Sequence, residues 1–282
     1  ESGFYSRKNE SKITSLLTKA TGNEFEHKFL IFEKNIKDQY RFEHTINIAY
    51  KYDLEGEKIS SDHKFPAYCF FRTRESKELK FIVHAPFLLT DSREGIKEDV
   101  WNDFLIKELA ELVGDSLPEI RKMGLLDVDF LNVLPIIKDD FKDSEFQPIY
   151  DAVLNKLSSD EKLLSANDGS RISAKQALLA RGEGLTNLLD SGQLSQLFEI
   201  ENCQWLDSSI PENSAIWNYL KDELKIPIVR PETFVNKLKD EFIQKQSDGW
   251  MIKFYSFLLK PKELWEKPDS ILRQKKFIRL SD

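Results

Sequence analysis

The sequence predicts an α+β protein, in which a sheet covered by helices is followed by a mainly helical domain. Residues 44–52 alternate apolar and polar side chains, a pattern typical of a half-buried strand. After Asp99 the apolar residues instead recur at the spacing of an amphipathic helix, and helical spacing dominates from about residue 146. We therefore expect an α+β domain over residues 1–145 and a mainly helical domain over residues 146–282.

The first domain is expected to contain a sheet of about four mostly antiparallel strands, because the strand-like segments follow one another along the chain. The alternating segment places Ile46, Ile48, Tyr50 and Tyr52 on one face. The predicted strands lie at residues 29–32, 44–52, 68–72 and 80–84.

A helix that begins after Asp99 is expected to cover this sheet. Asp99 is a suitable N-cap, because its short carboxylate can accept a hydrogen bond from the first turn. The expected apolar face consists of Trp101, Phe104, Leu105, Leu109, Leu112 and Val113. A second helical piece is predicted over residues 117–123, ending at Gly124.

The second domain is predicted from helical spacing and from residues that end helices. Helices are expected from about Phe146, over residues 215–224, from Pro231 and from about Asp248 to before Pro261. The helix after Pro231 would carry Phe234, Leu238 and Phe242 at four-residue spacing. A polar turn is expected at residues 167–170.

Composition limits the classes of function. With 282 residues and 40% hydrophobic residues, the chain can bury a large core. The net charge of −7 argues against broad attraction to nucleic acid or to an anionic membrane. Cys69 and Cys203 lie in apolar stretches and are expected to be core thiols of a reducing compartment. With neither a signal peptide nor a run of ~20 apolar residues, we expect a cytoplasmic location.

The segment from His84 to Lys97 is the strongest candidate for function. A predicted strand ends there in a polar loop that holds Asp91, Ser92, Arg93 and Glu94, and a helix follows. Arginine binds phosphate oxygens well, because its planar fork is always charged. The alternative is a surface arginine paired with Asp91 or Glu94.

The loop sequence PFLLTDSREGI resembles the arginine loop in the middle domain of the 90-kDa heat-shock chaperones. The longer string KFIVHAPFLLTDSREGIKEDVWNDFL, with CFFRT before it and LLDVDFLNVLPI after it, is more similar to the sacsin-like branch of these GHKL ATPases. The resemblance covers roughly Phe25 to Leu134. It implies a middle or transducer-like domain in the first part of the chain.

The resemblance implies that Arg93 contacts the γ-phosphate of ATP and that Ser92 and Glu94 shape its loop. Lys97 stands where the chaperones have a glutamine, so either Lys97 contacts phosphate itself or the water-positioning role lies elsewhere. ATP and Mg²⁺ would bind to an N-terminal ATP-binding domain of the same parent chain. The pocket motifs, a helix with Glu and Asn and an Asp-x-Gly-x-Gly turn, do not occur in this sequence in that order.

The expected function is that of an internal fragment of an ATP-dependent, chaperone-like conformational ATPase. The fragment would supply Arg93 and couple the nucleotide state to domain movement, with protein clients as further partners. Alone, it would not hydrolyse ATP. The alternative is a non-catalytic interaction scaffold that keeps the fold without nucleotide coupling, of which Lys97 would be a sign. No motif supports a hydrolase or nuclease active in its own right.

Weaker candidates are more typical of structural roles. The segment ARGEGLTN, residues 180–187, has two glycines but lacks the pattern of a phosphate-binding loop, and a turn between helices is expected. Asp127, Asp129 and Glu119 are expected to be capping or solvated residues rather than metal ligands. His84 is expected to be a core histidine or to brace the loop.

The aromatic side chains near residue 250 also allow two interpretations. Trp250, Phe254, Tyr255 and Phe257 are expected to form helix core. The alternative is that part of this cluster meets a neighbouring domain, because its members occupy more than one helix face.

Overall fold

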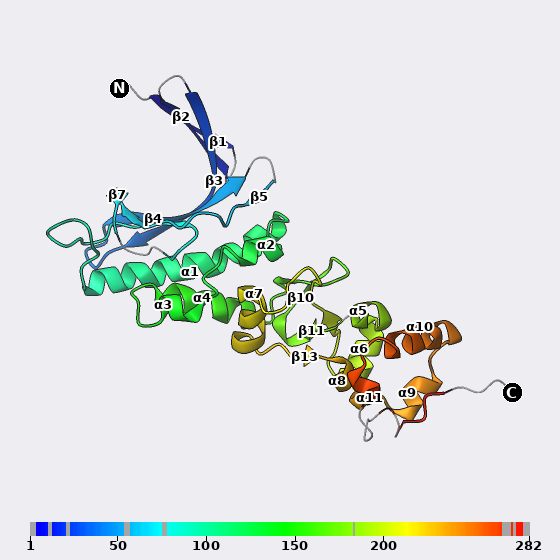
Figure 1. Cartoon of the computed structure of the whole chain (residues 1–282). Coiled ribbons are helices and arrows are strands. Elements are labelled where there is room, and N and C mark those ends of the chain that lie inside the picture. The colour runs from blue at the N-terminus through cyan, green and yellow to red at the C-terminus, as the bar shows by residue number, and fades with distance from the viewer. Residues whose placement is uncertain are drawn as a thin grey trace. The chain divides into compact units, whose positions relative to one another are not determined.

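The computed structural model describes residues 4–10, 13–20, 23–53, 57–74, 78–182, 184–266, 272 and 275–278. Two compact units make up the chain, Glu1–Ser159 and Asp160–Asp282 (Figure 1). The first is a sheet covered by helices, and the second combines short strands with helices. The predicted α+β class is therefore confirmed.

The sheet of the first unit has more strands than the sequence predicted. Its strands are β1 (Phe4–Glu10), β2 (Ile13–Ala20), β3 (Asn23–Lys37), β4 (Glu43–Asp53), β5 (Lys58–Ile59), β6 (Ala67–Cys69), β7 (Phe71–Arg72) and β8 (Ile82–His84). Within the described residues they form one eight-stranded sheet in the order β1-β2-β3-β4-β8-β6-β7, with β5 paired to β4. All pairs are antiparallel except β6 with β8, which run parallel. At its centre, Ile48 lies between Phe32 and Val83.

The segment predicted as one strand over residues 68–72 is in fact a tight reversal. Phe70 has a positive φ of 58° and separates β6 from β7, which pair with each other. Its side chain is 76% exposed. A bulky residue in the left-handed region is unusual, so the sequence pattern did not indicate this turn.

Helix α1 (Val100–Lys122) covers one face of the sheet. Its N-cap is Asp99, as predicted, and the Asp99 carboxylate accepts a hydrogen bond of 2.9 Å from the Trp101 amide. The separate helix predicted over residues 117–123 is wrong, because α1 continues through Pro118 despite the missing N–H. The helix ends at Lys122, and the φ of +76° at Gly124 allows a Schellman cap in which the Leu125 amide donates to the Ile120 carbonyl at 3.1 Å.

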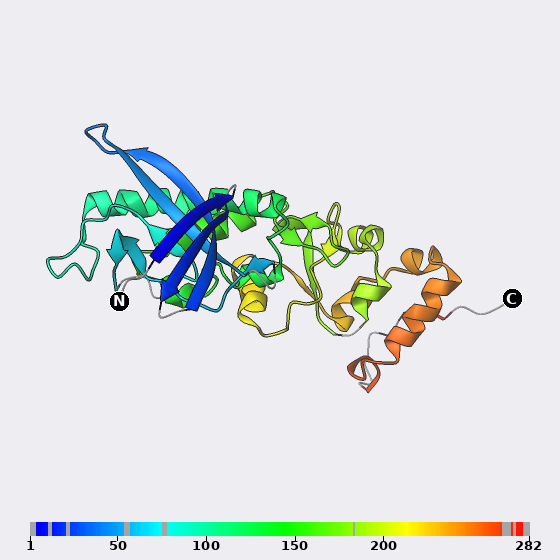
Figure 2. The same ribbon diagram turned by 90° about the horizontal axis from the view of Figure 1, so that it is seen from above.

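The apolar face of α1 packs on the sheet as predicted. Leu105, Leu109 and Val113 have no exposed surface, while Trp101 and Phe104 at the start of the face are half-buried. In Figure 2 the blue strands of the sheet lie over the green helix α1.

Tyr50 is the central aromatic residue of this core. It is fully buried, and its ring lies 5.1 Å from Phe81 and 5.4 Å from Phe130, between ring centroids. Its hydroxyl forms a 3.2 Å hydrogen bond with the hydroxyl of Ser116 on α1. This bond satisfies a polar group that burial would otherwise penalise.

Three further helices complete the first unit: α2 (Val128–Leu131), α3 (Lys138–Phe141) and α4 (Gln147–Ser158). Helix α4 lies against α1, where Gly114 approaches the Ala152 carbonyl (Figure 1). The unit boundary consequently falls after Ser159 rather than near residue 145.

The second unit contains two small sheets in a region that the sequence predicted to be mainly helical. The strands are β9 (Leu164–Ser165), β10 (Arg171–Ile172), β11 (Ala177–Ala180), β12 (Gln204–Trp205) and β13 (Ile228–Val229), with a 3₁₀ turn η1 (Ala174–Gln176) before β11. Strands β9 and β10 form a hairpin around the predicted turn at residues 167–170. Strand β11 lies between β12 and β13 and is parallel to both.

The helices of the second unit are mostly short. They are α5 (Leu185–Leu188), α6 (Ser191–Phe198), α7 (Ala215–Asn218) with the π-helical η2 (Tyr219–Glu223), α8 (Pro231–Lys237), α9 (Asp240–Gln244), α10 (Asp248–Leu258) and α11 (Glu263–Glu266). The single helix predicted through Phe234, Leu238 and Phe242 is wrong, because Leu238 is extended and separates α8 from α9. All three side chains are nevertheless buried.

Helix α10 supplies the aromatic centre of the second core. Phe254 has no exposed surface, and its ring stacks on Trp250 with centroids 5.0 Å apart. The Trp250 indole donates a 2.8 Å hydrogen bond to the Leu188 carbonyl. Because Phe257 is also buried, the interpretation of this cluster as core is confirmed for these three residues.

Cys69 and Cys203 are buried free thiols, as predicted. Burial raises the pKa of the Cys203 thiol to about 11, which favours its neutral form. None of the described helices is both long enough and apolar enough to cross a membrane.

Candidate functional site

The segment between β8 and α1 forms a closed loop, which we call the Arg93 loop (residues 85–99). Leu89 and Ile96 form an antiparallel bridge across it. Nearer the tip, the Thr90 amide donates to the Gly95 carbonyl at 2.9 Å, and the Arg93 amide donates to the Thr90 carbonyl at 2.8 Å. The backbone is thus paired within the loop, which leaves the side chains at its tip free to face solvent.

Asn102 of α1 ties the two arms of the loop together at their base. Its side-chain amide donates to the Leu88 carbonyl at 2.8 Å and to the Lys97 carbonyl at 2.7 Å, and its oxygen accepts from the Leu88 amide at 2.8 Å. Beside it, the Trp101 indole donates to the Pro86 carbonyl at 3.1 Å. Asn102 is only 1% exposed. It was missed from the sequence, because one polar residue in an apolar helix face gives no sign of its partners.

Replacing Asn102 with alanine should lower the free energy of unfolding of the first unit by about 3 kcal/mol. The substitution removes three hydrogen bonds at a buried position, each worth roughly 1 kcal/mol. Urea unfolding followed by circular dichroism measures the loss. As a control, Asn35→Ala on β3 removes a single exposed hydrogen bond with Thr45 and should cost under about 1 kcal/mol. A loss for Asn102→Ala no larger than that of the control would contradict its assigned role.

Arg93 lies at the exposed tip of the loop with a positive φ of 59°. The pairing of Arg93 with Asp91 or Glu94, the alternative left open by the sequence, does not occur. Glu94 instead pairs with Arg74, whose Nη2 lies 2.7 Å from its carboxylate oxygen. Among the described residues, the Arg93 guanidinium has no hydrogen-bond or ion-pair partner.

Ser92 and Lys97, the other predicted site residues, have different positions in the loop. The Ser92 hydroxyl lies 3.2 Å from that of Thr90, so Ser92 takes part in the internal bonding of the tip. Lys97 is at the base, where its amide donates to the Leu88 carbonyl at 2.9 Å and its side chain is exposed. Arg93 therefore lies at the tip of the loop and Lys97 at its base.

An aromatic groove adjoins the base of the Arg93 loop. Its lining residues come from the β3–β4 connection, the loop and the start of α1: Lys37, Asp38, Gln39, Tyr40, His44, Pro86, Leu88, Asp99, Val100, Trp101 and Phe104. The groove has a volume of about 760 Å³. Val100 is 84% exposed, Tyr40 73% and Leu88 44%. So much exposed apolar surface in one place is typical of a contact site.

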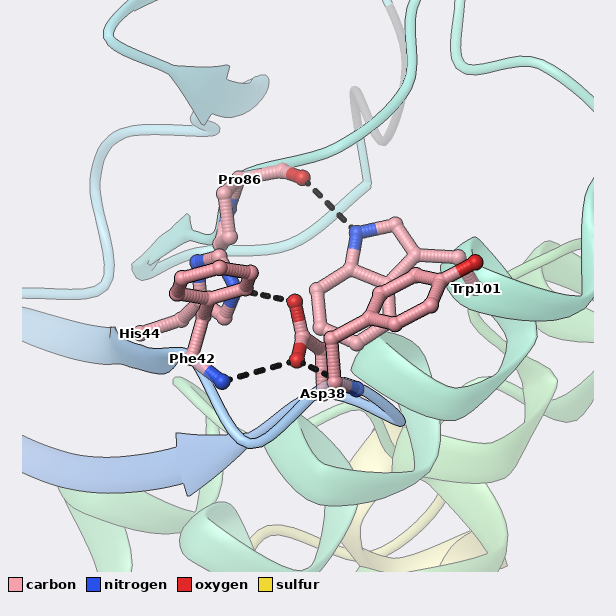
Figure 3. Close-up of polar contacts among 6 residues, drawn as sticks. Asp38, Phe42, His44, Pro86 and Trp101 are labelled. Atoms are coloured by element: carbon pink, nitrogen blue, oxygen red, sulfur yellow. Dashed lines mark hydrogen bonds and ion pairs between the residues drawn. The ribbon is translucent and has the colours of Figure 1, made fainter.

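Asp38 organises one wall of this groove (Figure 3). Its carboxylate accepts hydrogen bonds of 2.9 Å from the Tyr40 and Phe42 amides and lies 3.2 Å from Nε2 of His44. The His44 ring in turn packs edge-on against Trp101, with centroids 5.2 Å apart. Partial burial raises the pKa of Asp38, but the hydrogen bonds from His44 and the two amides lower it more, so this pKa lies below its usual value.

The groove was not predicted from the sequence. The alternation in β3 and β4 indicated strands, but Tyr40 and Phe42 lie in the connection between them, where loop residues are commonly polar. Two exposed aromatic residues in a short connection were the available signal.

The remaining sequence candidates have structural roles. Asp127 caps α2 by accepting a 2.7 Å hydrogen bond from the Phe130 amide, and Asp129 pairs with Lys58 at 2.8 Å. Glu119 pairs with Lys122 at 2.7 Å. No cluster of His, Cys, Asp or Glu able to hold a metal ion occurs within the described part of the chain.

His84 supports the turn at Phe70. Its Nε2 accepts a 3.4 Å hydrogen bond from the Phe70 amide, and the two rings pack edge-on with centroids 5.7 Å apart. Its buried Nδ1 has no hydrogen-bond partner among the residues that the structure describes, and burial lowers the pKa of the ring.

Comparisons with known proteins add no relative to this description, since no family model, curated protein or solved structure matches the chain.

Proposed function

We propose that this chain is the middle region of an ATP-dependent, chaperone-like conformational ATPase. In this proposal Arg93 contacts the γ-phosphate of ATP held by an N-terminal ATP-binding domain of the same cytoplasmic parent chain. The carrying observation is the exposed Arg93 guanidinium, which has no partner among the described residues while its neighbour Glu94 is paired elsewhere.

The residues present fit an incoming phosphate. Hydrolysis of ATP, with its bound Mg²⁺, develops negative charge on the γ-phosphoryl oxygens. An arginine fork can bind two such oxygens, and a guanidinium already paired with a carboxylate would have to break that pair first. The Glu94–Arg74 pair leaves Arg93 available and holds the loop from the side of β7.

The backbone of the loop also suits this task. Its internal hydrogen bonds and the three bonds from Asn102 fix the position of the tip before any ligand arrives. Electrostatic stabilisation is most effective when the charged group needs little reorganisation. We therefore expect the loop to move as one body with the start of α1.

The aromatic groove offers a surface on which the ATP-binding domain could dock. Leu88 belongs both to the groove and to the loop, and Trp101 in the groove is hydrogen-bonded to Pro86 of the loop, so a domain seated on the groove would lie next to the Arg93 loop. Burying these exposed apolar side chains would favour docking by about 25 cal/mol per Å² of apolar surface. Domain closure would then bring Arg93 to the γ-phosphate in the same step.

Hydrogen exchange of the intact parent tests this proposal. A non-hydrolysable ATP analogue should slow amide exchange by about tenfold or more in residues 38–44 and 86–101, because closure covers the groove and the loop. ADP should have a smaller effect, and residues 164–172 of the second unit serve as an internal control. Equal exchange with and without the analogue would instead support the alternative of an interaction scaffold without nucleotide coupling.

A further inference from the structure

A second polar pocket lies in the other unit, at the carboxyl end of its parallel sheet. Strand β11 ends at Ala180, which lies beside Val229 at the end of β13. The Arg181 amide continues the ladder by donating to the Val229 carbonyl at 2.9 Å. The residues that follow the two strands, Arg181 and Arg230, are therefore neighbours at the carboxyl end of the sheet.

The order of the strands makes the carboxyl end of this sheet a place where ligands commonly bind. From β11 the chain passes to β12 on one side of β11 and then to β13 on the other side of β11. In parallel sheets the connections after the strands diverge at such a reversal, and a crevice opens at the carboxyl ends. Here the crevice has a volume of about 550 Å³, within the range of small-molecule sites.

The lining of this strand-end pocket is rich in cationic groups. Arg181 and Gly182 follow β11, Arg230 follows β13, and Lys260 follows α10. The Arg230 guanidinium has neither a hydrogen bond nor an ion pair in the part of the chain that the structure describes. Arg181 and Arg230 thus line one pocket, and arginine forks bind phosphate oxygens specifically because each can donate two parallel hydrogen bonds.

Two carboxylates, Glu212 and Glu232, also line the pocket, and one of them already lies where an anionic ligand would bind. Glu212 is 3.1 Å from Nε of Arg181 and accepts a long, 3.4 Å hydrogen bond from the Gly182 amide. Gly182 has a φ of +96°, which permits this turn directly after the strand. Glu212 and Arg181 are 39% and 44% exposed, so solvent weakens their pairing and a stronger anion could replace Glu212.

We propose that the strand-end pocket binds a small phosphorylated molecule, whose phosphate is held by Arg181, Arg230 and the Gly182 amide in place of Glu212. Phosphate is favoured over a carboxylate because it carries more charge and offers more oxygens to two forks. The remaining volume accommodates the rest of the molecule. This site is independent of the Arg93 loop, and the proposal does not rest on the proposed ATPase function.

Calorimetric titration of the 282-residue chain tests the site, with pyrophosphate as the first probe. We expect saturable binding at one site per chain. Arg230→Ala should weaken the affinity by about tenfold to hundredfold, because it removes charge-assisted hydrogen bonds. Arg230→Lys should weaken it less, since the charge stays and the fork is lost. Lys237→Ala on α8 is the matched control for loss of an exposed cation.

Glu212→Gln provides a test with the opposite sign. Removing the competing carboxylate should tighten pyrophosphate binding about threefold or more, whereas Glu201→Gln, an equal change in net charge, should alter it less than twofold. Equal effects of the two substitutions would contradict displacement of Glu212. Absence of pyrophosphate binding, or unchanged affinity in Arg230→Ala, would overturn the site itself.

Two more probes identify the source of the phosphate. Glycerol phosphate should bind more tightly than orthophosphate if the pocket takes a phosphorylated molecule, because its organic part occupies the remaining volume. Tighter binding of orthophosphate would contradict that part of the proposal and leave a site for the free ion.

Discussion

Replacing Arg93 with alanine in the intact parent should lower kcat for ATP hydrolysis by about 10³-fold or more. An arginine supplied to the γ-phosphoryl group stabilises charge that develops in the transition state, and such residues are worth 10³–10⁵ in rate. Because Arg93 would reach the phosphate only on closure, the KM for ATP should change much less than kcat. Steady-state phosphate release measures both constants.

Two further substitutions separate the charge of Arg93 from the conformation of its backbone. Arg93→Lys keeps a positive charge without the fork and should give an intermediate rate. Lys225→Ala in the second unit is the control for backbone strain. Lys225 is also an exposed basic residue in the left-handed region, with a φ of 57° compared with 59° for Arg93. Its kcat should equal that of the wild type. A rate for Arg93→Ala within twofold of the wild type would show that Arg93 does not serve hydrolysis.

Replacing Phe254 with alanine should lower the free energy of unfolding of the second unit by about 3–5 kcal/mol. The ring has no exposed surface and contacts Phe234 at 6.0 Å and Trp250 at 5.0 Å between centroids. Its removal loses apolar burial and leaves a cavity that rigid neighbouring rings fill only in part. Urea unfolding followed by tryptophan fluorescence measures the change, since Trp250 stacks on the deleted ring.

Ile252 offers a control on the same helix. Its side chain is 66% exposed, so Ile252→Ala should change the free energy of unfolding by less than about 0.5 kcal/mol. A loss below about 1 kcal/mol for Phe254→Ala would show that the aromatic cluster is not the core of its unit.

The sequence predicted those elements whose signals are local. Asp99 caps α1 because its short carboxylate reaches the next turn, and Ile46, Ile48 and Tyr50 are buried together because alternate residues of a strand share a face. A separate helix was predicted over residues 117–123, but α1 continues through Pro118. A proline removes one hydrogen bond, and here the packing of α1 between the sheet and α4 outweighs that loss.

The candidate sites depend on contacts between distant residues, so the sequence predicted them only in part. Arg93 was identified through resemblance, but its lack of a side-chain partner among the described residues was not predicted, since Glu94 pairs with Arg74, which is distant in sequence. The strand-end pocket depends on parallel pairing between strands of only a few residues, 177–180 and 228–229. Strands so short carry no periodic signal, and only the glycines of the ARGEGLTN segment marked the place.

The continuity of α1 has a mechanical consequence. The 23 residues of α1 form one continuous helix about 35 Å long. Asn102 in its first turn is hydrogen-bonded to the Arg93 loop, and Ser116 nearer its other end is hydrogen-bonded to Tyr50 at the centre of the sheet. A displacement of the loop would therefore be transmitted through one continuous helix to the packed core around Tyr50.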